Sequence, residues 1–340
     1  MVYTKIMEKA YKFGKSSYKS QMNDNNHFLA LSGGGDRGVV MLGILIEMFE
    51  QKGEKAVGWT EIAGISAGAF CGGYISQTTP QTFRVEAQKL KDYFVSGQFD
   101  VVEPWVWGGQ VINFIAAFAS HNSMFTNGKM VHMIDKWFDE KRMIRRFKVG
   151  TFNKTKSRYE TFDSLDKTHD MKKAMLASAS VPVFLPEVSI DEFNYQDGCM
   201  RHIIPVPEID DWITRTSGKR QLDIVVCFPV NRSDIFLKMV TPVTFNPLIN
   251  EATRVMADLM LEQLQNDLKY IARICDVPLC EITKKSCGKF VSGDLTVQIL
   301  SPAEGKFTSF LDMNGEKNEK MFETGSTIVK NFLGNLQLKY

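Results

Sequence analysis

Short apolar blocks alternate with polar and glycine-rich blocks along most of the chain, and their spacing predicts a regular order of strands and helices. The apolar residues 27–31 precede a glycine loop and an apolar stretch at 39–52 that has the length of a buried helix. The same order follows with a strand at 60–65 and a helix of small residues at 67–77. Strands that alternate with helices in this way predict an α/β fold with a parallel, helix-flanked sheet.

The rest of the chain adds elements of both kinds without a linker or an internal repeat. The predicted strands are at 147–152, 158–162, 193–195, 223–228 and 295–300, and the predicted helices are at 170–180, 248–273 and 316–333. Residues 1–26 are a separate segment, a basic amphipathic helix followed by a polar break. Such a helix packs on the domain or lies on anionic lipid, and we favour packing. We expect residues 27–340 to form a single domain.

Composition limits the kinds of partner, metal site and membrane contact that we expect for this chain. Its 340 residues are 44% hydrophobic and 24% charged, and the net charge of +2 favours neither nucleic acid nor a strongly acidic partner. The six cysteines are too sparse for a disulfide framework, and their spacing matches no zinc pattern, so we expect no metal site. We see no secretory signal and no membrane-spanning stretch, so we expect a cytoplasmic protein whose membrane contacts are peripheral.

The sequence Gly64-Ile65-Ser66-Ala67-Gly68 lies between the second predicted strand and the helix after it. Glycines two positions before and after a serine remove the Cβ atoms that would collide in a sharp strand-to-helix turn. The N-terminus of the following helix would direct free N–H groups and a positive dipole end at the hydroxyl. The motif therefore indicates a nucleophilic Ser66, with a plain tight turn as the alternative.

Residues 32–38 read SGGGDRG and lie between the first predicted strand and its helix. A phosphate-binding loop would need a lysine followed by serine or threonine, which this loop lacks. Gly33, Gly35 and Gly38 have the spacing of a dinucleotide-binding motif, but the next strand ends in the serine motif and not in an acidic residue. The third use is an oxyanion hole, in which backbone N–H groups stabilise a tetrahedral intermediate. Adjacent parallel strands would bring this loop and Ser66 to the same end of the sheet.

A nucleophilic serine needs a base, and the sequence offers two kinds. Histidine is the usual base, but no histidine of the chain lies in a stretch typical of a catalytic loop. The five histidines are His27, His121, His132, His169 and His202. Asp197 differs, because Asp197-Gly198 ends a short predicted strand and precedes a turn region. An Asp-Gly pair is also typical of a tight turn, so both interpretations stay open on these residues alone.

In this order along the chain, SGGGDRG, GISAG and QDGC resemble the signatures of the patatin-like phospholipases. Those signatures are a G-G-G-x-R-G loop, a G-x-S-x-G elbow and a D-G-[A/G] aspartate, which match residues 33–38, 64–68 and 197–198. The block AMLASASVPVFLPEV at 174–188 resembles the helix and proline-rich approach to the aspartate in that family. Cys199 departs from the pattern, since alanine or glycine is usual after Asp-Gly.

The resemblance implies a three-layer helix–sheet–helix fold around a mostly parallel sheet, and a serine–aspartate dyad without histidine or cofactor. Ser66 would attack an ester carbonyl, and Asp197, with its pKa raised by burial, would act as the base. Arg37 would brace the glycine loop or attract a lipid phosphate. The supporting residues that the family implies are Gly33, Gly34, Gly35, Asp36, Arg37 and Gly38 in the oxyanion loop, Gly64 and Gly68 in the elbow, and Gly198 beside the aspartate.

The substrate that the resemblance implies is a phospholipid or another acyl-glycerolipid, cleaved at a membrane surface by a phospholipase A-type reaction. Residues 101–119 contain Trp105 and Trp107 in an apolar run, which predicts either an internal helix or a lid that contacts the lipid headgroups. Three other functions stay open. These are a Ser-His-Asp α/β-hydrolase that uses His202, a non-catalytic lipid-binding protein on the same fold, and a nucleotide-binding protein that uses the glycine loop.

Overall fold

A large mixed sheet forms the centre of the computed structural model, which describes residues 26–96, 103–104, 123, 125–230, 247–284, 287–302 and 315–337. Within these ranges, nine strands join in the order β10-β11-β9-β1-β2-β5-β8-β7, with β6 also paired to β5. The strands of this sheet are β1 (Asn26–Leu31), β2 (Glu61–Ile65), β5 (Arg146–Asn153), β6 (Arg158–Asp163), β7 (Val188–Ile190), β8 (Phe193–Asp197), β9 (Arg220–Val225), β10 (Cys287–Ser292) and β11 (Leu295–Leu300). The short strands β3 (Glu103–Pro104) and β4 (Phe125–Thr126) pair with each other.

The middle of the sheet is parallel and buried on both faces. Strands β11, β9, β1, β2 and β5 are parallel neighbours, and the other four strands run antiparallel to the strands that they pair with. Every residue of β2 is buried, as is every residue of β1 after Asn26, which is typical of strands covered by helices on both sides. The α/β fold with a mostly parallel sheet, predicted from the sequence, is confirmed.

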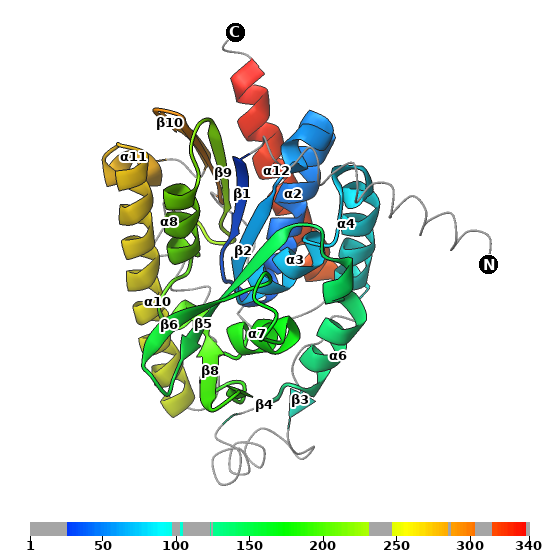
Figure 1. Ribbon diagram of the computed structural model, residues 1–340, viewed down its shortest axis with the longest axis vertical. Coiled ribbons are helices and arrows are strands. Elements are labelled where there is room, and N and C mark those ends of the chain that lie inside the picture. The colour runs from blue at the N-terminus through cyan, green and yellow to red at the C-terminus, as the bar shows by residue number, and fades with distance from the viewer. Residues whose placement is uncertain are drawn as a thin grey trace, which may run out of the picture.

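Helices on the two faces of the sheet complete three layers (Figure 1). One face is covered by α2 (Gly38–Lys52), α3 (Ala67–Ile75), α4 (Pro80–Val95) and α12 (Gly315–Gln337), and the other by α8 (Val206–Arg215) and α10 (Pro247–Ile274). The remaining helices of the described ranges are α6 (Gly128–Trp137), α7 (Met171–Ser178) and the short α11 (Leu279–Thr283). α7 packs on β5 and α3, so its C-terminus lies near the end of β2.

Strand β5 extends beyond the end of β2, and this overhang positions β8. β2 ends at Ile65, whose partner on β5 is Gly150. The next residues of β5 pair with β8 in the opposite direction, beginning with Thr151 opposite Asp197. Because β6 occupies the other edge of β5, β2 and β8 share one edge and lie end to end along it. The last residue of β8 therefore arrives beside the last residue of β2.

Several expectations concern residues outside this description. The predicted basic helix of residues 1–26 lies almost entirely outside the described ranges, so that helix and the division at residue 27 remain predictions.

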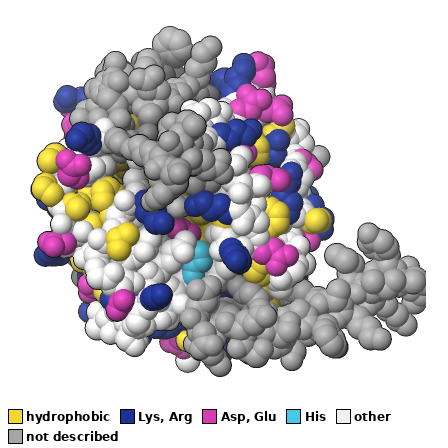
Figure 2. All heavy atoms as spheres, turned by 90° about the horizontal axis from the view of Figure 1, so that it is seen from above, with side chains coloured by type: hydrophobic (Ala, Val, Ile, Leu, Met, Phe, Trp, Pro, Cys, Tyr) yellow, Lys and Arg dark blue, Asp and Glu magenta, His cyan; other side chains and the backbone are white. Residues whose placement is uncertain are grey.

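Among the helices that the structure describes, none has a stretch long and apolar enough to span a bilayer. On the face drawn in Figure 2, lysine and arginine side chains lie among aspartate and glutamate side chains, in keeping with the small net charge.

Candidate active site

Ser66 occupies a sharp turn between β2 and α3, with its backbone in the left-handed region at a φ of 54°. For a residue with a Cβ this conformation costs roughly 1–2 kcal/mol, and such strain is the signature of a nucleophile elbow. The two glycines make the turn possible. A Cβ on Gly64 would lie 2.2 Å from the carbonyl oxygen of Gly68, and a Cβ on Gly68 would lie 2.4 Å from that of Leu31. Because α3 begins at the next residue, its N-terminus lies beside the serine.

The main chain of Ser66 is held by a second serine, Ser178, at the end of α7. The N–H of Ser66 donates to Ser178 Oγ at 2.9 Å, and that hydroxyl donates to the carbonyl of Gly150 at 2.6 Å. Two residues further on, the carbonyl of Ser180 accepts the N–H of Asp197 at 3.0 Å. The end of α7 and the residues directly after it therefore hold both Ser66 and Asp197. We did not predict these contacts from the sequence, where the alternating alanines and serines at 174–180 were the available signal.

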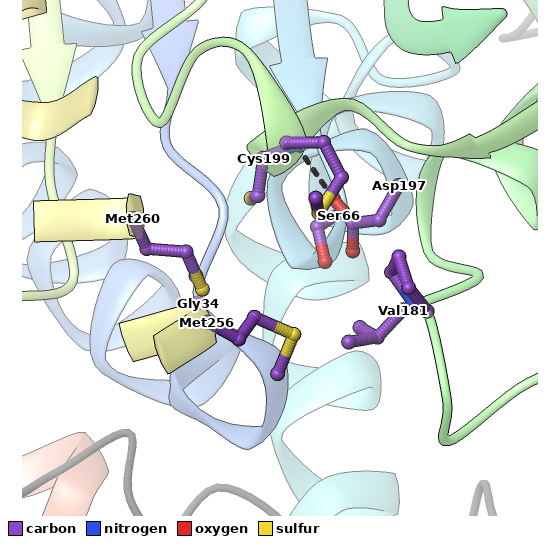
Figure 3. A pocket seen from close by; sticks show the side chains of 9 residues that line it. Gly34, Ser66, Val181, Asp197, Cys199, Met256 and Met260 are labelled. Atoms are coloured by element: carbon purple, nitrogen blue, oxygen red, sulfur yellow. Dashed lines mark hydrogen bonds between the residues drawn. The ribbon is translucent and has the colours of Figure 1, made fainter. Parts of the chain in front are cut away.

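Asp197 is the last residue of β8, and its side chain is 2% exposed. Its Oδ1 accepts the N–H of Cys199 at 2.8 Å, while Oδ2 accepts no hydrogen bond from the described residues. Figure 3 shows the hydroxyl of Ser66 and the carboxyl of Asp197 side by side. Burial raises the pKa of Asp197 from 3.8 to about 6, against the opposite effects of the Cys199 N–H and the Ser66 hydroxyl. At neutral pH this carboxyl is ionised and is a stronger base than an exposed aspartate.

The residues after Asp197 form a 3-10 turn, Gly198–Met200, that packs against the glycine loop. A Cβ on Gly198 would lie 2.5 Å from the carbonyl oxygen of Gly150, so glycine is required for this close approach. The Sγ of Cys199 fills the space beside Gly33, where an added Cβ would lie 2.1 Å from the sulfur. The unusual cysteine therefore fits because the glycine loop leaves room for its sulfur.

The glycine loop follows β1 and lies at the same end of the sheet as Ser66, because Leu31 and Gly64 are paired neighbours. The N–H of Gly33 donates to the carbonyl of Ile203 at 2.9 Å. The N–H groups of Gly34 and Gly35 have no acceptor among the described residues, which leaves them available to an oxyanion. Gly35 has a φ of 60°, a conformation that glycine adopts without strain.

Asp36 and Arg37, the two charged residues of the loop, are both fully buried. The guanidinium of Arg37 donates to the carbonyl of Gly34 at 3.4 Å and lies over the ring of Phe228, 5.3 Å from its centroid. It also lies 3.6 Å from the carboxyl of Asp36. These contacts support the bracing role for Arg37, because a buried guanidinium does not face the phosphate of a lipid headgroup. Gly38 then begins α2.

A pocket joins these groups to an apolar wall (Figure 3). Its lining residues are Gly34, Ser66, Val181, Pro182, Asp197, Cys199, Met200, Met256 and Met260. The last two methionines come from α10, so a helix far along the chain contributes to the site. The predicted nucleophile, the predicted base and one glycine of the predicted oxyanion loop therefore line a single pocket.

The other candidates from the sequence lie elsewhere. His202 is not one of the pocket-lining residues; its Nδ1 lies 2.7 Å from Oδ1 of Asp267, and its ring packs edge-on against Tyr159. Trp105 and Trp107 lie outside the described residues, so the lid remains a prediction. In the part of the chain that the structure describes, no group of three or more His, Cys, Asp and Glu side chains is placed to hold a metal ion.

Comparison with known sequences assigns the family. Residues 29–210 match the family described as patatin-like phospholipase. The match covers more than half of the chain and includes both glycine motifs and Asp197. The chain belongs to the patatin-like phospholipase family, which confirms the resemblance and places it in the general class of lipid acyl hydrolases. No individual curated protein matches the chain.

Solved structures resemble this one at low sequence identity. Human GIVD cytosolic phospholipase A2 has a TM-score of 0.52 and 8% identity, over 97% of this chain and 66% of that one. VipD from Legionella pneumophila has a TM-score of 0.41 and 11% identity, over 92% of this chain and 67% of that one. ExoU from Pseudomonas aeruginosa, in complex with SpcU, has a TM-score of 0.30 and 12% identity, over 72% of this chain and 52% of that one. The chain thus spans 52% to 67% of these proteins, and the first likeness supports the patatin fold.

Proposed function

We propose that the protein is a phospholipase A-type lipid acyl hydrolase, with Ser66 as the nucleophile and Asp197 as the base. The observation that carries this proposal is the buried carboxyl of Asp197, with a pKa of about 6, beside the hydroxyl of Ser66 in an apolar pocket. A base of this strength is ionised at neutral pH and can accept the serine proton. Membership of the patatin-like phospholipases supports a lipid ester as the substrate.

The acylation step uses all three parts of the site. The Oγ of Ser66 attacks the ester carbonyl carbon while its proton passes to Asp197. The carbonyl oxygen becomes an oxyanion, which the N–H groups of Gly34 and Gly35 stabilise, each donor contributing about 3–4 kcal/mol to the transition state. When the intermediate collapses, the bond from the carbonyl carbon to the alcohol oxygen breaks. Asp197 returns its proton to that alcohol, and the acyl group stays on Ser66.

Deacylation repeats the sequence with water. Asp197 takes a proton from a water molecule whose oxygen attacks the acyl carbon, and the same glycine N–H groups stabilise the second oxyanion. The ester bond to Ser66 then breaks, the serine regains a proton from Asp197, and the fatty acid leaves. A single carboxyl therefore serves as base and acid in both halves of the reaction.

The apolar wall of the pocket supports a fatty acyl substrate. Val181, Met256 and Met260 line the pocket beside Ser66. Methionine side chains are unbranched and adjust to irregular apolar shapes, which suits chains of varied length and unsaturation. An acyl chain bound there leaves its ester carbonyl near the hydroxyl of Ser66.

Fatty acid release from phosphatidylcholine vesicles tests the proposal. We expect the Ser66→Ala and Asp197→Asn variants to lose activity by a thousandfold or more, on the order of the loss seen when nucleophile or base is removed from other serine hydrolases. Matched controls are Ser76→Ala and Asp223→Asn, which alter a buried hydroxyl and a buried carboxyl outside the pocket. Controls that lose activity equally, or variants that keep it, would contradict the assignment.

The same assay, together with a measurement of heat protection, separates the rival functions. A Ser-His-Asp hydrolase would lose activity in His202→Asn, whereas the dyad predicts activity within about fivefold of wild type, because His202 does not line the pocket. A non-catalytic lipid-binding protein would release no fatty acid above the rate without protein. A nucleotide-binding protein would be protected against heat by a nucleotide, and we expect no such protection.

A further inference from the structure

Helix α10 connects the acyl pocket to a buried carboxyl that the proposed reaction does not use. Met256 and Met260 line the pocket, and Leu264, Asp267 and Ile271 continue along the same face at intervals of three and four residues. The side chain of Asp267 is 2% exposed, although the residues around it on this face are apolar. A buried carboxyl in such a place requires hydrogen-bond partners.

Asp267 has three such partners, all in the segment that follows the Gly198–Met200 turn. Its Oδ2 accepts the N–H groups of Ile203 at 2.7 Å and Ile204 at 2.9 Å, and its Oδ1 lies 2.7 Å from Nδ1 of His202. Burial raises the pKa of Asp267, and the interactions with His202 and the two N–H groups oppose this effect. Both oxygens of the carboxyl are therefore engaged by one short stretch of main chain and its histidine.

Ile203 carries this contact to the glycine loop. Its N–H donates to Asp267, and its carbonyl accepts the N–H of Gly33 at 2.9 Å. Gly33 is followed directly by Gly34 and Gly35, whose N–H groups are the proposed oxyanion donors. A continuous series of hydrogen bonds therefore runs from α10 through Ile203 to the base of the oxyanion loop.

We infer that Asp267 is a positioning residue for the proposed reaction, which fixes Ile203 so that Gly33 holds the N–H groups of Gly34 and Gly35 at the oxyanion. This inference rests on the proposed function. Hydrogen bonds to an ionised acceptor are shorter and stronger than neutral ones, so a carboxyl limits the movement of Ile203 more than an amide would. Displacement of catalytic groups by about 1 Å is enough to lower a rate by about a hundredfold.

A purely structural role, in which Asp267 only attaches α10 to the domain, makes a different prediction. The same helix has a second polar contact one turn away, where the hydroxyl of Tyr270 donates to Oδ1 of Asp210 on α8 at 2.5 Å. That contact attaches α10 to the domain without touching the glycine loop. Tyr270→Phe therefore serves as a matched control, because it removes a contact of the helix and leaves Asp267 in place.

The experiment measures turnover of a soluble short-chain ester at pH 8 by wild type, Asp267→Ala, Asp267→Asn and Tyr270→Phe. Labelling to completion with a fluorophosphonate counts the competent serines, so that kcat is expressed per active site and does not depend on the folded fraction. We expect Asp267→Ala to lower kcat per site about 10- to 100-fold and the labelling rate in proportion, with KM within about threefold. Asp267→Asn, which keeps one acceptor oxygen, should lower kcat per site about 3- to 10-fold, and Tyr270→Phe should lower it less than twofold.

The outcomes separate the inference from the proposed function. If both Asp267 variants keep kcat per site within twofold of wild type, or if Tyr270→Phe lowers it as much as they do, the inference is wrong. Should Asp267→Ala fail to fold, Asp267→Asn decides by the same criterion. If wild type has no Ser66-dependent esterase activity at all, the proposed function fails first, a result that none of the Asp267 outcomes would produce.

Discussion

The N–H of Ser66 donates a 2.9 Å hydrogen bond to the hydroxyl of Ser178, a residue 112 positions further along the chain. That hydroxyl in turn donates to the carbonyl of Gly150, at the point where β5 begins its overhang beyond β2. The strained backbone of the elbow is therefore tied both to α7 and to the strand that carries β8. This connection holds the proposed nucleophile, Ser66, in place relative to the proposed base, Asp197.

The first prediction concerns that connection. Ser178→Ala leaves the N–H of Ser66 and the carbonyl of Gly150 without their shared partner, which costs about 1–3 kcal/mol in a buried site. We expect kcat to fall about tenfold and the melting temperature to fall by several degrees, measured by ester hydrolysis and calorimetry. The control is Ser180→Ala, because the hydroxyl of Ser180 bonds to the carbonyl of Leu176 and not to the elbow. Equal effects of the two variants would argue against a specific role for Ser178.

The second prediction is the pH dependence of the rate. The proposed base acts only when ionised, and the pKa of Asp197 is about 6. The value of kcat/KM should therefore rise about tenfold for each pH unit below 6 and level off above pH 7. A soluble ester avoids changes in membrane charge. A profile that levels off near pH 4 would mean that Asp197 is not desolvated, and a profile with a midpoint near 7 that disappears in a His202 variant would favour the histidine.

The third prediction links the base to stability. Because folding raises the pKa of Asp197 from 3.8 to about 6, the folded state holds this proton more tightly than the unfolded state. The favourable contribution is present below pH 4 and is lost as pH rises to 6, so the ionised carboxyl costs the folded protein about 3 kcal/mol above that pH. Asp197→Asn should therefore raise the melting temperature at pH 8 and leave it nearly unchanged at pH 4. A variant no more stable than wild type at pH 8 would contradict this.

The fourth prediction tests the contact between Cys199, the residue after Asp197-Gly198, and Gly33 of the glycine loop. A Cβ on Gly33 would lie 2.1 Å from Sγ of Cys199, so Gly33→Ala should destabilise the protein by about 1–3 kcal/mol and displace the loop. Cys199→Ala removes the sulfur, and in that background Gly33→Ala should cost less than half as much. Urea unfolding of the four proteins gives the coupling energy directly. Additive effects would mean that the loop moves aside without contact with the sulfur.

The fifth prediction addresses the acyl pocket. Met260 is 5% exposed and lines the pocket, so Met260→Phe should block part of the space for the acyl chain. We expect the ratio of kcat/KM for a long-chain ester over a short-chain ester to fall about tenfold. Val255→Phe is the control, because Val255 is half exposed on the same helix and outside the pocket. An unchanged ratio in Met260→Phe would place the acyl chain elsewhere.

The sequence was most informative where a constraint is local. The elbow glycines and Gly198 are required by backbone approaches of 2.2 to 2.5 Å, and such requirements leave glycines at fixed offsets that can be recognised in one sequence. Most of the predicted strands and helices are present within a few residues of their predicted bounds, because their apolar residues have a clear period.

Other elements escaped prediction for physical reasons that can be identified. Pro205 and Pro207 lie in the stretch after Asp197-Gly198 that we predicted as a turn region, but α8 begins there at Val206. Proline is tolerated in the first turn of a helix because the N–H that it lacks has no partner within the helix. Helix α4 starts with a Thr79 capping box whose third residue is threonine and not the usual glutamate, which hides the signal. Ser178 and Asp267 act through hydrogen bonds across 112 and 64 residues, and no local pattern records such pairings.

The overhang of β5 determines which insertions and deletions in the chain would move Asp197 away from Ser66. Since Asp197 stands opposite Thr151 through ladder pairing, we expect extra or missing residues at 165–169, before α7 begins, to leave Asp197 beside Ser66 while α7 and β8 dock in the same way. A shift of one residue within β8 is different, because it sets Gln196 in that place and turns every side chain of the strand to the opposite face. The register of a three-residue ladder is thus what places the proposed base beside the proposed nucleophile.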